Sequence, residues 1–118
     1  MTEPCELSAV EARRLIGAKR LSPVELLESC MRRISATNGR LNGIVAMDER
    51  AARKAAKAAE NAVMRGDDLG LLHGLPIGVK DLQDTEGLKT TYGSLLYKDH
   101  VPEIDNSMIA GIRAEGGV

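Results

Sequence analysis

The apolar residues between positions 22 and 38 recur at spacings of three and four, which is the repeat of an amphipathic helix. These residues are Val24, Leu27, Met31 and Ile34. The stretch begins with Ser22-Pro23-Val24-Glu25, which combines a capping box with proline at the first helical position. We therefore expect a helix over roughly 23–37 that ends at Asn38-Gly39.

Signals for shorter helices appear near both ends of the chain. Ser8 and Glu11 form a capping box, and Gly17 is placed to end the helix that follows. Asp105 is predicted to cap a last helix, which ends at Gly116-Gly117. One face of that last helix carries the apolar residues Met108, Ile109 and Ile112.

The middle of the chain is predicted to alternate strand and helix. A brief apolar run at 43–47 is expected to be a strand, and the alanine-rich stretch 48–65 is helical by propensity. The predicted packing face of this helix consists of Ala52, Ala55, Ala59, Ala62 and Val63. The uncharged run 75–79 has Pro76 near its start and is predicted to be a buried strand, and the polar stretch from Asp84 to Lys89 to form a turn.

This order of elements predicts an α/β fold with parallel strands. A parallel sheet needs several strands with both faces covered, and only two strands are predicted here. A helix that ends in Gly-Gly is normally followed by another strand, and Val118 stands where that strand would begin. We therefore expect residues 1–118 to be the N-terminal part of one domain, with helices packed on an incomplete mixed or parallel sheet. Within it, 1–40 is a helical hairpin and 41–118 is the start of the α/β core.

Composition limits the core and the classes of partner. Hydrophobic residues make up 43% of the 118 residues, but Phe and Trp are absent, so the core must be aliphatic. Sixteen basic and seventeen acidic residues leave a net charge of −1, which gives no bias toward nucleic acid or an anionic membrane. No apolar run has the length of a membrane span, and the N-terminus does not resemble a signal peptide. We expect a cytoplasmic protein in which Cys5 and Cys30 stay reduced.

The residue with the most chemical promise is Lys80, the first charged residue after the predicted strand 75–79. A lysine carried to the end of a buried strand is expected to be only half solvated, and burial lowers the pKa of an ammonium group. A lysine kept neutral in this way can act as a general base. From the residues alone, a solvated charge at a strand end remains the alternative.

The other polar residues of this region have structural interpretations. His73 and His100 are widely separated in predicted loops and do not make a metal site. Ser94 is expected to bond its own backbone in a turn or loop. We predict no metal and no cofactor. Three carboxylates lack the spacing of a calcium loop and are expected to serve turns and backbone bonding: Asp81, Asp84 and Glu86.

The motif around Lys80 resembles the amidase signature family. The matching residues are Leu72-His73-Gly74-Leu75-Pro76-Ile77-Gly78-Val79-Lys80-Asp81, then Asp84, Gly87, Thr90-Thr91 and Gly93-Ser94. The resemblance extends in chain order to 21–27 and 42–45 upstream, and to 100–102, Asp105 and 112–116 downstream. The resemblance covers nearly the whole chain. The chain is similar to the N-terminal portion of amidases and of the A subunit of glutamyl-tRNA amidotransferases.

The resemblance implies that amide groups are hydrolysed or transferred by a serine–cis-serine–lysine triad in which Lys80 is the base. In that scheme the neutral lysine takes a proton through the bridging serine, and the second serine attacks the amide carbonyl. Both serines belong to a glycine- and serine-rich segment that these 118 residues do not contain. The serines present are Ser8, Ser22, Ser29, Ser35, Ser94 and Ser107. We therefore expect no amidase activity from this chain alone.

Three functions stay open from the sequence. The first is the N-terminal portion of a hydrolase of small amides, completed by a C-terminal part or by a complementing chain. The second is the same portion of an amidotransferase component that works on an aminoacyl-tRNA. A basic helix face would suit that role, although a solvated face is its ordinary interpretation: Arg50, Arg53, Lys54 and Lys57. The third is a non-catalytic interaction fragment. An unpaired strand edge also predicts self-association.

Overall fold

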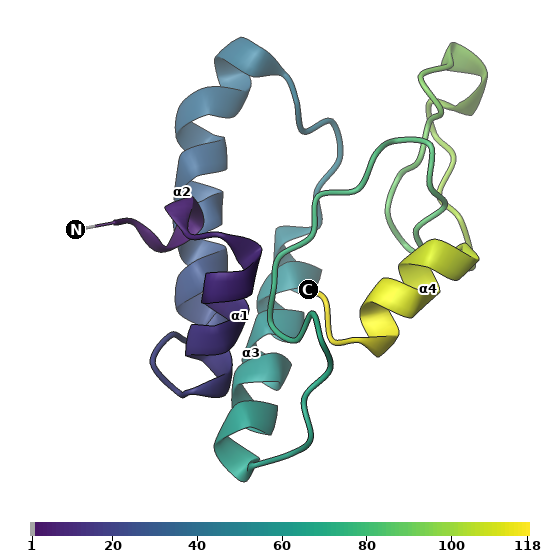
Figure 1. Cartoon of the computed structure of the whole chain (residues 1–118). Helices are drawn as coiled ribbons and strands as arrows, with labels where there is room; N and C mark the ends of the chain where they lie inside the picture. The colour runs from purple at the N-terminus through teal and green to yellow at the C-terminus, as the bar shows by residue number, and fades with distance from the viewer. Residues whose placement is uncertain (1) are drawn as a thin grey trace.

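The computed structural model describes residues 2–118, and their regular structure is helical (Figure 1). The elements in chain order are η1 (Pro4–Glu6), α1 (Ala9–Gly17), α2 (Pro23–Leu41), α3 (Glu49–Arg65), η2 (Leu95–Tyr97) and α4 (Ser107–Ala114). Helices α1, α2 and α3 form a helical layer, and α4 lies on the other side of the molecule. The C-terminus lies between α3 and α4 in this view.

Most helix starts follow the capping residues in the sequence. The side chains of Ser8, Ser22 and Asp48 each accept a hydrogen bond from a backbone N–H in the first turn of α1, α2 and α3. These three starts confirm the predictions, and α2 has the complete capping box. The start of α4 differs, because Asn106 rather than Asp105 is its cap and accepts from a first-turn N–H at 2.9 Å.

The helix α2 continues one turn beyond its predicted end. Asn38 and Gly39 lie inside the helix, and Asn42 caps it in the left-handed conformation, with φ of 50°. The Asn38 side chain bonds both the N–H and the C=O of Ile44, each at 2.9 Å. The second Asn-Gly pair, at Asn42 and Gly43, therefore ends the helix. Asn38 of the first pair instead holds the segment that follows the helix, through the backbone of Ile44.

The core is aliphatic, as composition predicted, and lies where the helical layer meets residues 69–77. Its buried members are Ala12, Ile16, Leu21, Leu26, Val63 and Leu75. A smaller cluster between α2 and α3 contains Leu27, Met31 and Ala56. The predicted face of α3 was wrong by one position, because Ala56 is fully buried whereas Ala55 is exposed. The buried positions 56, 59 and 63 keep the spacing of three and four.

The predicted sheet is not supported, because no strand is assigned within residues 2–118. The run 43–47 is irregular and mostly exposed, so neither of its faces is covered. The run 75–79 lies against the end of the chain: Val118 N–H donates to Leu75 O at 2.9 Å, and Ile77 N–H donates to Val118 O at 3.0 Å. This exchange has the pattern of a parallel pair. One bonded pair does not make a strand, because a parallel sheet needs several paired members.

Residues 81–106 form a separate unit, the polar lobe, which is held mainly by hydrogen bonds. The turn predicted within 84–89 is confirmed as an isolated antiparallel bridge. The Asp105 carboxylate accepts from Glu86 N–H at 2.7 Å and pairs with Arg113 Nε of α4, also at 2.7 Å. These bonds explain why Asp105 does not cap α4: its side chain joins that helix to the polar lobe.

Candidate active site

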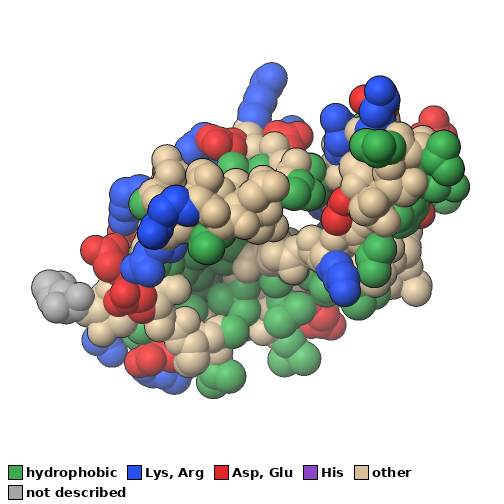
Figure 2. Space-filling model, turned by 90° about the horizontal axis from the view of Figure 1, so that it is seen from above, with side chains coloured by type: hydrophobic (Ala, Val, Ile, Leu, Met, Phe, Trp, Pro, Cys, Tyr) green, Lys and Arg blue, Asp and Glu red, His purple; other side chains and the backbone are tan. Residues whose placement is uncertain are grey.

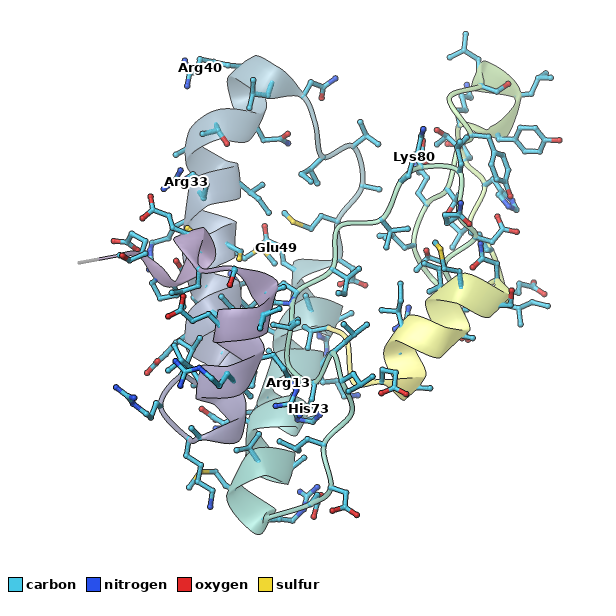
Figure 3. All side chains as sticks on the ribbon, in the orientation of Figure 1. Arg13, Arg33, Arg40, Glu49, His73 and Lys80 are labelled. Atoms are coloured by element: carbon cyan, nitrogen blue, oxygen red, sulfur yellow. The ribbon has the colours of Figure 1, made fainter. Side chains whose placement is uncertain are left out.

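Lys80 lies on the segment that links the helical layer to the polar lobe, and its side chain is exposed (Figure 3). The run 75–79 has no neighbouring strands to cover its end, which leaves Lys80 in an exposed position. The backbone before Lys80 is nevertheless held. Ile77 bonds Val118, and Gly74 N–H donates to Gly116 O at 2.9 Å.

Asp81 fixes the backbone immediately after Lys80. One carboxylate oxygen accepts from Thr91 N–H at 2.7 Å, and the other accepts from the Thr91 hydroxyl. The Thr91 hydroxyl first, and then its backbone N–H, hold the pKa of Asp81 below its usual range. The predicted backbone bonding of Asp81 is confirmed, and the consequence is that the residue after Lys80 is tied to the polar lobe.

An aromatic cluster in the polar lobe was missed at the sequence level. The rings of Tyr92, Tyr97 and His100 lie with their centroids 5.1 to 5.9 Å apart. The Tyr92 hydroxyl donates to the Asp84 carboxylate, and chiefly this bond raises the pKa of Tyr92 to about 12. The one available signal was that both tyrosines and His100 fall within 92–100.

The serines do not complete a catalytic group with Lys80. Ser94 accepts from Leu96 N–H at 3.2 Å, which confirms its predicted local bonding. Ser29 is buried and accepts from Cys5 N–H at 3.0 Å. No hydrogen bond joins a serine to Lys80 anywhere in residues 2–118. Within the described residues, Lys80 therefore has no serine as a hydrogen-bond partner.

The histidines also have separate places. His73 Nε2 lies 2.9 Å from Ala59 O and joins the core segment to α3, whereas His100 belongs to the aromatic cluster. In the part of the chain that the structure describes, no group of three or more His, Cys, Asp or Glu side chains is arranged to hold a metal ion. None of the helices there is long and apolar enough to cross a membrane.

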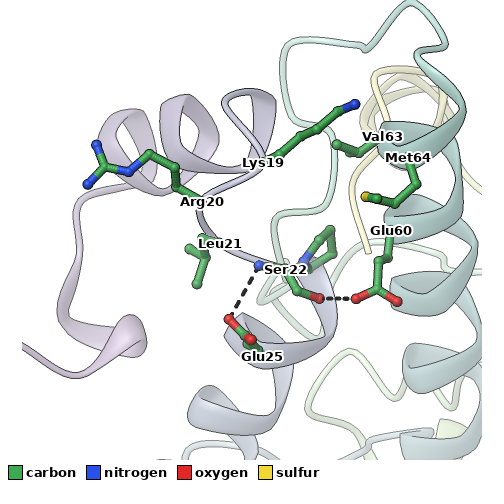
Figure 4. A pocket seen from close by; sticks show the side chains of 9 residues that line it. Lys19, Arg20, Leu21, Ser22, Glu25, Glu60, Val63 and Met64 are labelled. Atoms are coloured by element: carbon green, nitrogen blue, oxygen red, sulfur yellow. Dashed lines mark hydrogen bonds between the residues drawn. The ribbon is translucent and has the colours of Figure 1, made fainter.

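Lys80 lines neither of two hollows on the surface of residues 2–118. The smaller, about 180 Å³, lies between α3 and the turn that joins α1 to α2 (Figure 4). Across it Ser22 donates to Glu60 Oε1 at 2.6 Å, so these two side chains already have partners. The larger, about 520 Å³, is an open hollow between 45–49 and 87–89. Neither hollow places Lys80 beside a bound substrate.

Comparison with known proteins defines the class. The sequence profile of the Amidase family matches residues 25–118. The chain is 39% identical over 116 residues to the A subunit of the glutamyl-tRNA(Gln) amidotransferase of Anaeromyxobacter dehalogenans, and the match covers 98% of this chain and 24% of that protein. It is 36% identical over 113 residues to a putative amidase, AmiD, of Mycobacterium bovis, covering 96% of this chain and 24% of that one. The crystal structure of a bacterial aryl acylamidase of the amidase signature family matches with a TM-score of 0.86 and 28% identity, covering 95% and 24% of the two chains.

The family profile, the curated relatives and the solved structure agree on one class of protein. The chain belongs to the amidase signature family. It spans about a quarter of the length of the curated relatives that it matches, 24% in each case.

Proposed function

We propose that this chain is the lysine-bearing N-terminal portion of an amide hydrolase, with Lys80 as the base of a Ser–cis-Ser–Lys triad. The observation that carries the proposal is the match of the amidase family across residues 25–118, which includes the whole motif around Lys80. The anchored backbone on both sides supports it, because Ile77 and Asp81 restrain the path of the chain while the amino group stays accessible.

The proposed reaction breaks an amide C–N bond in two steps. Unprotonated Lys80 Nζ accepts the proton of the bridging serine while that serine accepts the proton of the nucleophilic serine. The nucleophilic oxygen attacks the carbonyl carbon, the amine leaves with a proton, and water releases the acid from the acyl-enzyme. Backbone N–H groups stabilise the oxyanion.

The exposure of Lys80 indicates what the rest of the enzyme must supply. A lysine acts as a base only through its unprotonated amino group, and a covered environment favours that form. The completed site therefore has to cover Lys80 and contribute both serines. We propose that residues beyond these 118, on the same polypeptide or on a complementing chain, do so and form the pocket for a small amide.

The surface supports completion of this kind. Leu95 and Leu96 of η2 are 88% and 91% exposed. Figure 2 shows apolar side chains on the surface of the lobe at the right. Large apolar side chains exposed together are typical of surfaces that another segment or chain covers.

Amide hydrolysis by the isolated chain tests the proposal. We expect the purified 118-residue chain to release no amine from aryl and aliphatic amides above the level of its Lys80→Ala variant, because it lacks a nucleophile. Turnover that disappears in Lys80→Ala would show instead that these residues contain a complete catalytic site.

The same portion of an aminoacyl-tRNA amidotransferase is the second candidate, favoured by the 39% identity to a component of an enzyme of that name. The electrostatics of α3 favour it less. Arg53 is paired with Glu28 at 2.7 Å and with Glu49, and Lys57 is paired with Glu60. Binding of the completed protein to its cognate tRNA, weakening steeply with salt, would select this candidate over a small-amide hydrolase.

A further inference from the structure

We propose that Asn42 is a site of spontaneous deamidation, at which the backbone nitrogen of Gly43 displaces the side-chain amide. The inference concerns a chemical modification and is independent of the proposed amide hydrolysis. It rests on a contrast between two pairs, Asn38-Gly39 and Asn42-Gly43. The two pairs have the same sequence, but the fold gives them different surroundings.

Asn42-Gly43 is exposed and lacks the side-chain hydrogen bonds that hold Asn38. Asn42 is exposed and caps α2 in the left-handed conformation, and Gly43 is exposed in the loop that follows. Within residues 2–118, neither the Asn42 side-chain amide nor the Gly43 N–H takes part in a hydrogen bond. A Cβ built on Gly43 would meet no atom within 4 Å, so the space beside this residue is open.

Asn38-Gly39 is protected by the fold. Both residues lie inside α2, where the helical ladder holds each backbone N–H against the carbonyl four residues earlier. The Asn38 amide is itself engaged, with its nitrogen and its oxygen each 2.9 Å from the Ile44 backbone. Attack by Gly39 would require both restraints to open first.

The other two asparagines are not followed by glycine. Asn61 lies in the interior of α3. Asn106 uses its amide oxygen to cap α4, and its amide nitrogen donates to Gln83 Oε1 at 2.5 Å. The structure therefore selects Asn42 from the four asparagines of the chain.

The reaction needs only water and a base. Gly43 N loses its proton to hydroxide and attacks Asn42 Cγ. The bond to the amide nitrogen then breaks, and this nitrogen takes a proton from water and leaves as ammonia. The resulting five-membered succinimide is opened by water at either carbonyl. One opening gives aspartate, and the other gives isoaspartate, in which the main chain contains an additional methylene.

Either product changes the end of α2. A carboxylate at a helix C-terminus faces the negative end of the helix dipole, which destabilises the last turn. Isoaspartate also lengthens the connection that leads to 45–49, which line the open hollow beside 87–89. We expect the aged protein to lose order in the last turn of α2 and to become more acidic.

Peptide mapping of the purified chain tests the inference. The chain is incubated at mildly alkaline pH, native and in concentrated urea, and both asparagines are followed by mass spectrometry and isoaspartate labelling. In the native chain we expect Asn42 to convert at least about tenfold faster than Asn38, because a helix must open locally before Asn38 can react. In urea the two rates should converge.

Two substitutions provide matched controls. Gly43→Ala should slow the conversion of Asn42, since the added methyl hinders attack but fits the free space at this position. Gly39→Ala should leave the conversion of Asn42 unchanged. Equal rates at Asn38 and Asn42 in the native chain, or an Asn42 rate that Gly43→Ala does not reduce, would overturn the inference.

Discussion

Lys80 and Asp81 are neighbours with opposite surroundings. The lysine side chain is exposed, whereas the aspartate is half-buried and bonded twice to Thr91. The proposed chemistry assigns the proton transfer to Lys80, and the structure assigns the local anchoring to Asp81. The sequence predicted backbone bonding for Asp81 but not its partner, because the Thr91 contact depends on how the polar lobe folds back.

The anchoring by Asp81 predicts a pH dependence. The pKa of Asp81 is lowered from its ordinary 3.8 in the folded chain, first by the Thr91 hydroxyl and then by its N–H. The ionised carboxylate therefore stabilises the folded chain fully when the pH is above the pKa of the unfolded state. This contribution is lost as the pH falls through the lower pKa of the folded state. Relative to wild type, Asp81→Asn should be most destabilised near neutral pH, and the difference should shrink below pH 3.8.

Tyrosine fluorescence during urea unfolding measures this difference, because Tyr92 and Tyr97 both lie in the polar lobe. Asp68→Asn is the matched control, since Asp68 is exposed and no side-chain hydrogen bond or ion pair of the described residues involves it. A destabilisation of Asp81→Asn that stays constant from neutral to acid pH would contradict the role given to its charge.

At the scale of elements, capping residues predicted the starts of α1 and α2 correctly, because a cap depends on residues within one turn, and helix propensity placed α3. Local signals failed where distant contacts decide the outcome. Asn38-Gly39 stays helical because its side chain is satisfied by Ile44, and Asp105 leaves the cap of α4 to bond Glu86 and Arg113. The predicted strands failed for the same reason, since a sheet exists only through its partners.

Replacement of two glycines by alanine should change the free energy of unfolding in opposite directions. Gly66 caps α3 with φ of 77°, where a Cβ meets no atom but costs about 1 kcal/mol in the left-handed conformation. Gly39 lies inside α2 with the same free space, so alanine should stabilise the chain by roughly 0.5–1 kcal/mol. The free energy of unfolding in urea measures both, and a shift of equal sign in the two variants would show that α2 does not extend past residue 39.

At the scale of the whole molecule, the family and its lysine motif could be predicted from the sequence, but the environment of Lys80 could not. The helical layer has its own aliphatic core, whereas the polar lobe exposes large apolar residues such as Leu95 and Ile104. The parallel contact between Val118 and the Leu75 region is a single bonded pair. Lys80 lies between these two parts, so its proposed chemistry depends on what covers both.

Grafting measures this claim most directly. Residues 1–118 replace the matching quarter of a related amidase, and amide hydrolysis is compared among the graft, its Lys80→Ala variant and its Lys89→Ala variant. Lys89 is a matched control, because it is also an exposed lysine, in the polar lobe. We predict that the graft hydrolyses amides, that Lys89→Ala retains this activity, and that Lys80→Ala loses it by about 10²–10⁴-fold, the range expected for a general base. Equal activity in the Lys80→Ala and Lys89→Ala grafts would contradict the assignment of Lys80 as the catalytic base.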